Sequence, residues 1–194
     1  SGKGAQVETY SMAPDERVWQ DGDVTHHTIA GKWHSRFRQW NDCHYFAFAL
    51  SSRLKHTKAD VVHCLNYFDA YAAIVARRRY GLPYKIVFHA VGIPTKRYFR
   101  AVPLDAWFFA QTLKHADEVW VLSTFAQQQL SQDFDCSSFI LPPPVFCEPV
   151  VDRTTETANT SPVSLLFVGD CNEPRKGAAL LARAFVKVKQ VYPQ

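Results

Sequence analysis

The sequence has no long apolar run and no closely spaced pair of cysteines. None of its apolar runs approaches roughly 18 residues, so it predicts no transmembrane helix. The five cysteines are odd in number and widely separated, which favours reduced thiols in a cytosolic protein over disulfides or a zinc site. Residues 1–4 lack an initiator methionine and the apolar core of a signal peptide. We therefore expect a piece of a longer protein.

The chain also has only a small excess of charge. Its formal net charge is +4 over 194 residues, which is too small to argue for a nucleic-acid partner, and we expect none. Basic residues cluster at 77–79 and 96–100. Solvated surface explains most clusters of this kind, and an anionic partner is the alternative. The length suits one large domain, or one domain and part of a second.

Short apolar segments alternate with helical patterns through the middle of the chain. The apolar segments have the length of strands buried on both faces. This alternation predicts an α/β fold, with a Rossmann-like parallel sheet, helices on both faces and right-handed crossovers. Ligands bind such sheets beyond the carboxyl ends of the strands. The expected strands are 60–65, 85–91, 118–122 and 139–141, and the expected helices are 35–56, 70–80, 104–115 and one that follows residue 122.

Residue types at the segment ends predict where the helix at 70–80 begins and ends. Asn66 and Tyr67 are expected to form a brief loop, and Asp69 is expected to cap the next helix. Gly81 is expected to end that helix, since glycine is common just after a helix.

Two polar stretches interrupt the pattern further along. Residues 92–103 are polar and basic and predict a long loop. Ser123 or Thr124 is expected to cap the following helix, and Thr124 with Gln127 fits a capping box.

The first thirty residues predict two short strands. These are 5–12 and 24–29, with a polar loop or hairpin at 15–22. His26 and His27 resemble a metal-binding pair, but neighbouring residues of a strand face opposite sides. We therefore do not expect them to be metal ligands.

A stretch rich in threonine, serine and asparagine divides the chain. Residues 151–161 are expected to be a linker. Residues 1–150 would then form an N-terminal Rossmann-like domain, and 162–194 would begin a second domain that the chain leaves unfinished. A lone βα unit cannot bury its own faces, so we expect it to pack on the first domain or to be poorly ordered.

The second domain is expected to open with a strand, a loop and a helix. Residues 164–168 are apolar and predict a buried strand that ends at Gly169. Arg175, Lys176 and Gly177 then open a helix with apolar residues at helical spacing. A helix N-terminus favours anions, so this segment could hold a phosphate or diphosphate. An ordinary βα unit with two solvated basic residues is the alternative.

Four blocks of the sequence together resemble a known family. They are ADVVHCLNYFDAYAAIVARRRYGLPYKIVFHAVG, HADEVWVLSTFAQQQL, FILPPPV and LLFVGDCNEPRKGAALLARAF. Their order and spacing are similar to those of retaining glycosyltransferases of family 4, which have the GT-B fold. The resemblance implies two Rossmann-like domains facing across a cleft, an acceptor on the N-terminal domain and a nucleotide sugar on the other.

The resemblance assigns the basic loop to the donor. It implies that Lys176 binds the donor diphosphate of a UDP- or GDP-sugar, and Gly169, Arg175 and Gly177 complete the expected site. A fixed cation there would stabilise the charge that builds on the leaving group. No cofactor and no metal would then be required. The implied reaction moves a hexose to a glycan or lipid-linked acceptor with retention at the anomeric carbon.

The resemblance also places His89 near the donor sugar as the expected catalytic residue; a core histidine at a strand end is the alternative. For His63, one strand earlier, a structural role is the favoured interpretation. The acceptor-side candidates are Asn66, Tyr67, Gly92, Lys96, Arg97 and Ser123, although helix capping alone explains Ser123. The polar and basic loop at 92–103, rather than the loop around Lys176, could also contact an anionic membrane surface. We expect a cytoplasmic protein, with the inner face of the membrane as an alternative place of action.

Three departures from the family pattern keep other functions open. Asp170 stands where many members carry arginine, the family's first strand with its Gly-rich loop is absent, and the family's paired glutamates would lie beyond residue 194. The fragment alone is therefore expected to be inactive. A GT-B-fold sugar-nucleotide epimerase and a non-catalytic scaffold domain are the alternatives.

Overall fold

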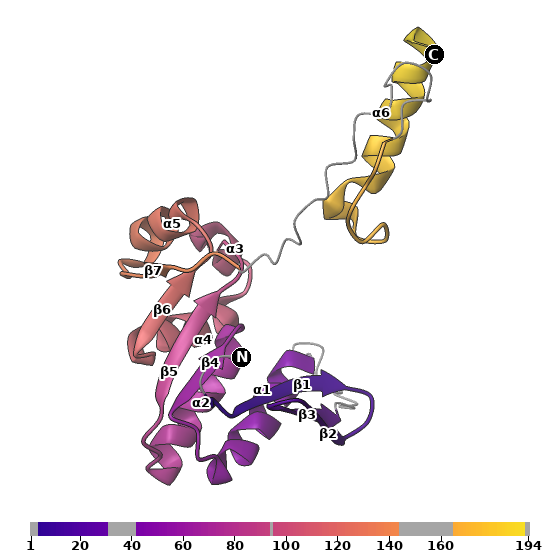
Figure 1. The fold of residues 1–194 in the computed structure, drawn as a ribbon. Helices are drawn as coiled ribbons and strands as arrows, with labels where there is room; N and C mark the ends of the chain where they lie inside the picture. The colour runs from indigo at the N-terminus through magenta and orange to yellow at the C-terminus, as the bar shows by residue number, and fades with distance from the viewer. Residues whose placement is uncertain (1–3, 31–41, 94, 144–164, 193–194) are drawn as a thin grey trace. The chain divides into compact units, whose positions relative to one another are not determined.

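The computed structural model describes residues 4–30, 42–93, 95–143 and 165–192 (Figure 1). The chain divides into two compact units, Ser1–Pro144 and Val145–Gln194. The expected linker over 151–161 lies outside the described residues.

A four-stranded parallel sheet organises the first unit. Its strands are β4 (Val61–Cys64), β5 (Lys85–Ala90), β6 (Glu118–Val121) and β7 (Phe139–Ile140), in the order β4-β5-β6-β7. All neighbouring pairs are parallel. The parallel sheet predicted from the alternation of segments is therefore confirmed. Full burial was wrong for β4, because it is an edge strand and Val61 is 52% exposed.

Helices flank this sheet, and their apolar side chains pack with those of the sheet to form the hydrophobic core of the unit. They are α1 (Asp42–Arg53), which continues into a 3-10 turn at Leu54–His56, α2 (Tyr67–Tyr80), α4 (Pro103–His115) and α5 (Thr124–Phe134). Helix α2 packs on β4, β5, α1 and α4, and α5 packs on β6 and β7. The fully buried side chains include Tyr84, Phe109, Ile74 and Leu130. Burying each large apolar side chain contributes about 1.5–3 kcal/mol.

Arg77 joins the end of α2 to the sheet. Its guanidinium pairs with the carboxylate of Asp117 and donates to the backbone oxygens of Tyr84 and His115. Burial opposes ionisation of Asp117, but the Ile86 N–H and Arg77 together hold the pKa of that carboxyl below its usual range. At least this member of the basic cluster at 77–79 is therefore part of the fold.

The expected start of helix α2 was wrong. The Asn66 side chain accepts a hydrogen bond from the Phe68 N–H at 2.9 Å, so Asn66 caps α2 and Asp69 does not. Tyr67 accordingly lies in the helix rather than in a loop. The end at Gly81 is confirmed, since this glycine has the left-handed backbone (φ 63°) that favours its residue type.

The capping box at α5 was also wrong. Ser123 is the cap, and its hydroxyl accepts from the Ala126 N–H at 3.2 Å. Gln127 instead donates from its side chain to the backbone oxygen of Ser138. Because Ser138 precedes β7, Gln127 ties α5 to that strand.

The expected loop at 92–103 contains a short helix, α3 (Lys96–Arg100). The Thr95 hydroxyl caps it by accepting from the Tyr98 N–H. Phe99 is 6% exposed and stacks on Phe109, with ring centroids 4.7 Å apart. The basic composition of the stretch hid this single apolar anchor, which orders the helix.

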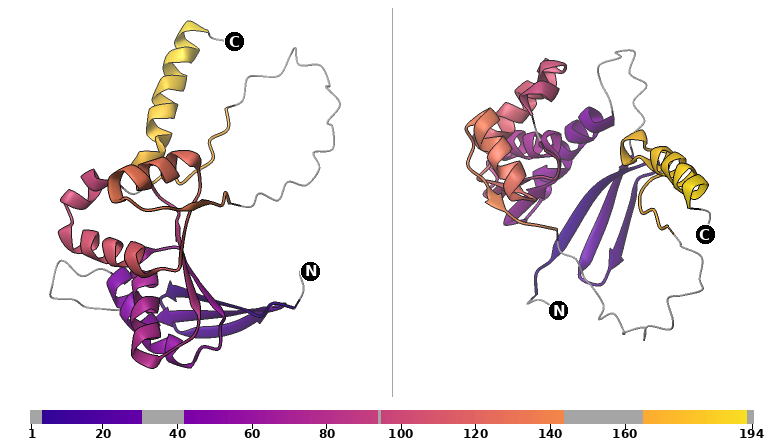
Figure 2. Two further views of the ribbon diagram at one scale, coloured as in Figure 1. Left: turned by 90° about the vertical axis from the view of Figure 1, so that its left-hand side faces the viewer. Right: turned by 90° about the horizontal axis from the view of Figure 1, so that it is seen from above.

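A second, three-stranded sheet precedes the parallel one (Figure 2). Its strands are β1 (Val7–Ala13), β2 (Arg17–Asp21) and β3 (Val24–Ala30), in the order β1-β3-β2. Strand β3 pairs parallel with β1 and antiparallel with β2. Both expected strands are confirmed. Where we expected a polar loop or a hairpin at 15–22, residues 17–21 form a third strand that makes a hairpin with β3. Ile29 belongs to the buried core, so this sheet is attached to the rest of the unit.

The second unit contains a 3-10 turn at Pro174–Lys176 and the helix α6 (Ala178–Val191). Residues 165–168 do not form a strand, and Leu166 and Val168 are 83% and 86% exposed. The strand prediction was wrong here because a strand needs a partner to satisfy its backbone, and the described residues offer it none. Helix α6 begins at Ala178, later than predicted, after the left-handed Gly177 (φ 76°).

Candidate functional site at the carboxyl edge of the parallel sheet

Three rings lie together on one face of the parallel sheet. His63 of β4 stacks on His89 of β5, with centroids 5.4 Å apart and planes at 12°. Trp120, the register partner of His89 on β6, meets both rings edge-on at 5.3 and 6.2 Å. We call His63, His89 and Trp120 the ring cluster.

His89 is the buried member of the ring cluster. It is 7% exposed, and its Nε2 is shielded from solvent and has no hydrogen-bond partner among the described residues. An unsatisfied buried polar atom costs about 1–3 kcal/mol. The cost indicates either strain or a partner that the described part of the chain does not supply.

His63 is the exposed member, and its pKa is lowered. Burial of part of the ring is the main cause, and the neighbouring His89 adds to it. The ring cluster does not have the geometry of a metal site. Imidazole lone pairs lie in the ring planes, so two nearly parallel rings do not converge on one ion.

Tyr67 and Asn66, which follow β4, serve the fold in this structure. The Asn66 oxygen is engaged in the cap of α2. The Tyr67 hydroxyl donates to Asp105 Oδ2 at 2.9 Å, and its ring packs on Phe99 and Phe109. Burial and the Asp105 carboxylate raise the pKa of Tyr67. The hydroxyl thus stays protonated and holds α2 to α4.

The sequence analysis did not identify Asp105 as a residue of this region. One of its oxygens accepts from Tyr67, and the other lies 3.9 Å from His44 Nε2 on α1. Three helices therefore meet at this carboxylate. No sequence motif marks it, because the three residues are far apart in the chain.

Further candidates lie at the same edge, after β5 and β6. Gly92 and the side chains of Lys96 and Arg97 are exposed. The Lys96 N–H donates to Asp133 Oδ2 at 2.8 Å, which joins α3 to α5 (Figure 1). Ser123 caps α5 at the carboxyl end of β6. Parallel strands therefore bring the acceptor-side candidates of the first unit to the carboxyl edge of one sheet.

The loop at 169–177, which the family resemblance assigns to the donor, is a compact turn in the second unit. Asp170 organises it, since its Oδ1 accepts from the Asn172 N–H at 2.9 Å and its backbone oxygen accepts from Glu173. A side chain on Gly169 would approach the Phe167 ring to 3.1 Å. Lys176 is exposed. Asp170, the departure from the family pattern, thus has a structural role.

Asp69 is a titratable group that the sequence assigned only to capping. It lies in the first turn of α2, and burial raises its pKa to about 6. A carboxyl group at the carboxyl edge of the sheet with such a pKa can exchange a proton near neutral pH.

We expect Asp69→Asn to stabilise the protein at pH 7 by about 1–3 kcal/mol. The folded-state pKa of about 6 lies above the ordinary aspartate pKa of 3.8, so the native state holds the proton to higher pH than the unfolded state. Stability therefore falls as pH rises from about 4 to about 6. Urea unfolding at pH 4, 5, 6 and 7 measures this slope, which should shrink in Asp69→Asn. Asp60→Asn is the exposed control, and an equal slope in all three proteins would contradict the assignment.

No group of three or more His, Cys, Asp or Glu within 4–30, 42–93, 95–143 and 165–192 could hold a metal ion. Two Asp-x-Asp triplets occur, Asp21 to Asp23 in the β2–β3 turn and Asp133 to Asp135 at the end of α5. Asp133 is engaged by the Lys96 N–H.

Within the same described ranges, every helix is too short or too polar to cross a membrane.

Comparison with known proteins places the chain in a family. The uncharacterized glycosyltransferase YqgM of Bacillus subtilis (strain 168) is 27% identical over 143 residues, which are 72% of this chain and 39% of that protein. A solved structure described as trehalose-6-phosphate from E. coli bound with UDP-2-fluoro glucose matches 63% of this chain and 34% of its own, with 14% identity and a TM-score of 0.47. A second, of trehalose-6-phosphate synthase, matches with 12% identity and a TM-score of 0.48, over 63% of this chain and 35% of that one.

The chain thus spans well under half the length of these proteins. The family model of Glycosyltransferase Family 4 matches residues 2–148, which is most of the sequence. The chain belongs to Glycosyltransferase Family 4.

Proposed function

We propose that the protein transfers a hexose from a nucleotide sugar to a glycan or lipid-linked acceptor, with retention at the anomeric carbon. Family membership over residues 2–148 is the observation that carries the proposal. The parallel sheet supports it, because its carboxyl edge gathers His89 and the acceptor-side candidates in one place.

His89 is the proposed residue at the reacting centre. Its Nε2 has no partner within the described residues, and a hydroxyl of the donor sugar would supply one. Because the atom is shielded by its surroundings in this structure, the contact requires rotation of the imidazole or displacement of a neighbouring ring. Substrate binding would provide the free energy for that movement.

The basic loop of the second unit is the proposed donor site. Lys176 is exposed, and Gly177 with its left-handed backbone leads directly into α6. The lysine charge and the N-terminal end of a 14-residue helix both favour a diphosphate. As the glycosidic bond breaks, the bond electrons and added negative charge pass to the diphosphate, where Lys176 stabilises them.

Cytoplasmic action belongs to the proposal as well. The odd number and wide spacing of the five cysteines favour reduced thiols, which supports this place of action.

A donor screen tests the proposed function. The protein expressed from its complete gene would be incubated with UDP-glucose, UDP-galactose and GDP-mannose, and release of UDP or GDP would be measured with and without a crude glycan and lipid extract as acceptor. We expect one donor to be consumed faster with the extract. NMR of the product would give the anomeric configuration. No release from any donor would overturn the proposal, and inversion would overturn its stereochemical part.

A further inference from the structure

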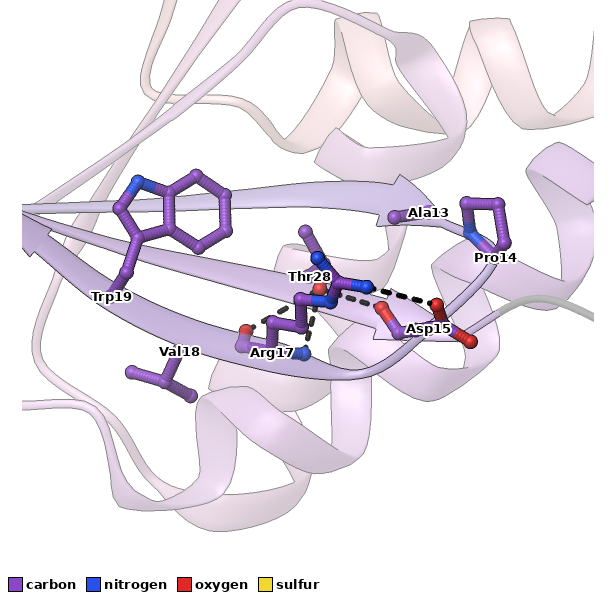
Figure 3. A pocket seen from close by; sticks show the side chains of 7 residues that line it. All are labelled: Ala13, Pro14, Asp15, Arg17, Val18, Trp19 and Thr28. Atoms are coloured by element: carbon purple, nitrogen blue, oxygen red, sulfur yellow. Dashed lines mark hydrogen bonds and ion pairs between the residues drawn. The ribbon is translucent and has the colours of Figure 1, made fainter.

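A cavity of about 740 Å³ opens beside the three-stranded sheet (Figure 3). Its lining includes Pro14, Asp15, Arg17, Trp19 and Thr28, which come from β2, β3 and the turn between β1 and β2. The volume lies within the roughly 300–1,000 Å³ of ordinary ligand pockets. Its lining includes no member of the ring cluster, which belongs to the other sheet of the unit.

Trp19 provides an aromatic surface at one end of this cavity. Its indole stacks on His26, the register partner on β3, with centroids 4.9 Å apart and planes at 15°. His26 is fixed in turn, since its Nδ1 lies 2.7 Å from Thr9 Oγ1 on β1. Trp19 nevertheless remains 47% exposed. A rigid aromatic ring is thus held in place from behind and open to solvent in front.

An exposed ion pair lies at the other end. Arg17 donates to Asp15 at 3.2 Å, and their side chains are 73% and 67% exposed. Thr28 fixes this turn, because its hydroxyl donates to the Asp15 backbone oxygen at 2.7 Å and accepts from the Arg17 N–H at 2.8 Å. Figure 3 shows the pair and the indole on the same side of the sheet, with Thr28 between them.

We propose that this cavity binds a neutral carbohydrate, with one sugar ring on Trp19 and its hydroxyls on the Asp15–Arg17 pair. One face of a pyranose presents C–H groups that pack on an aromatic ring. Neighbouring hydroxyls both donate and accept, so a carboxylate beside a guanidinium satisfies them together.

The charges of the pair select against anionic ligands. A phosphate that approached Arg17 would also approach the Asp15 carboxylate, which repels it. A nucleotide or a phospholipid headgroup is therefore disfavoured here. A nucleoside carries no phosphate, so the experiment below tests its binding separately.

The inference rests on the proposed function in one respect: an enzyme that extends a glycan meets such chains as its acceptor. The three-stranded sheet would then hold part of the acceptor away from the reacting centre. Loss of this contact would raise the KM for a long acceptor and leave donor binding unchanged.

Calorimetric titration with named sugars tests the proposal. Maltotriose, cellotriose, mannotriose and adenosine would be titrated into the wild-type protein, Trp19→Ala, Trp19→Phe and Trp107→Ala. Trp107 is the matched control, because it is 48% exposed and lies on α4. We expect at least one trisaccharide to bind to the wild-type protein. Trp19→Ala should bind it about 10-fold more weakly, and Trp19→Phe should recover the wild-type affinity.

Three outcomes would overturn the proposal: no trisaccharide binds, Trp19→Ala and Trp107→Ala behave alike, or adenosine alone binds at Trp19. The donor screen separates the two proposals. Sugar binding by a protein that consumes no donor would defeat only the proposed function, and donor consumption without sugar binding at Trp19 would defeat only this inference.

Discussion

Replacing His89 with asparagine is expected to lower kcat for sugar transfer by about 100-fold or more, with the donor KM changed only a few-fold. Loss of a group that acts on the reacting centre typically costs 10²–10⁴ in rate. Asparagine keeps a polar side chain of smaller volume in a position that is 7% exposed. A group that contacts the sugar mainly in the transition state affects kcat more than KM.

His63→Phe is the matched comparison for His89→Asn. His63 stacks on His89 at 5.4 Å, and phenylalanine keeps an aromatic ring at that place. We expect activity within about 3-fold of wild type, since the ring contact is preserved. Steady-state kinetics of both variants distinguish a catalytic role of His89 from a structural one. Urea unfolding shows whether each variant is folded. Equal kcat in wild type and a folded His89→Asn would leave His89 as a core residue only.

Replacing Phe109 with alanine is expected to destabilise the first unit by about 3–5 kcal/mol. Phe109 is 2% exposed and contacts the rings of Tyr67, Phe88, Phe99 and Phe134. These rings belong to five different segments, α2, β5, α3, α4 and α5, if Phe109 itself is included. The cavity left by the substitution would remove packing contacts from all of them.

Phe125→Ala is the control for Phe109→Ala, since Phe125 is on α5 and 60% exposed. Urea unfolding followed by circular dichroism should show a lower midpoint for Phe109→Ala and a change below about 1 kcal/mol for Phe125→Ala. Loss of α3 would accompany the first variant, because Phe99 is its buried anchor. Equal midpoints for the two variants would contradict the packing described for the core.

Local patterns were sufficient to predict the parallel sheet and most of its helices. The run at 85–91 is apolar because β5 lies between two strands and is buried, and Gly81 marks a left-handed helix end. The failures occurred where partners decide the structure. Residues 165–168 form no strand without a neighbouring one, and Leu165, Leu166 and Val168 are exposed. Asn66 rather than Asp69 is the cap of α2. Both residues are good capping types, so sequence could not choose between them.

The candidate site was predictable to a smaller extent. Parallel strand order brings the strand ends to one edge, so the positions of Gly92 and Ser123 followed from the alternation. The contact of His63 with His89 and Trp120 depends on how strands β4, β5 and β6 align with one another. Local sequence patterns show which residues form each strand but not how neighbouring strands align. Asp105 and the Trp19 cavity depend on tertiary packing in the same way. The catalytic, donor and acceptor roles of the predicted residues stay predictions.

Equilibrium binding of a nucleotide sugar to the protein expressed from its complete gene tests the account most directly. UDP-glucose and GDP-mannose would be titrated into wild type, Lys176→Ala and Lys187→Ala; Lys187 is an exposed lysine further along α6. We predict that wild type and Lys187→Ala bind one donor equally, and that Lys176→Ala binds it about 10–100-fold more weakly, as expected for loss of a charge-assisted contact to a diphosphate. Equal binding by all three proteins, or no binding by wild type, would contradict the assignment of this loop to the donor.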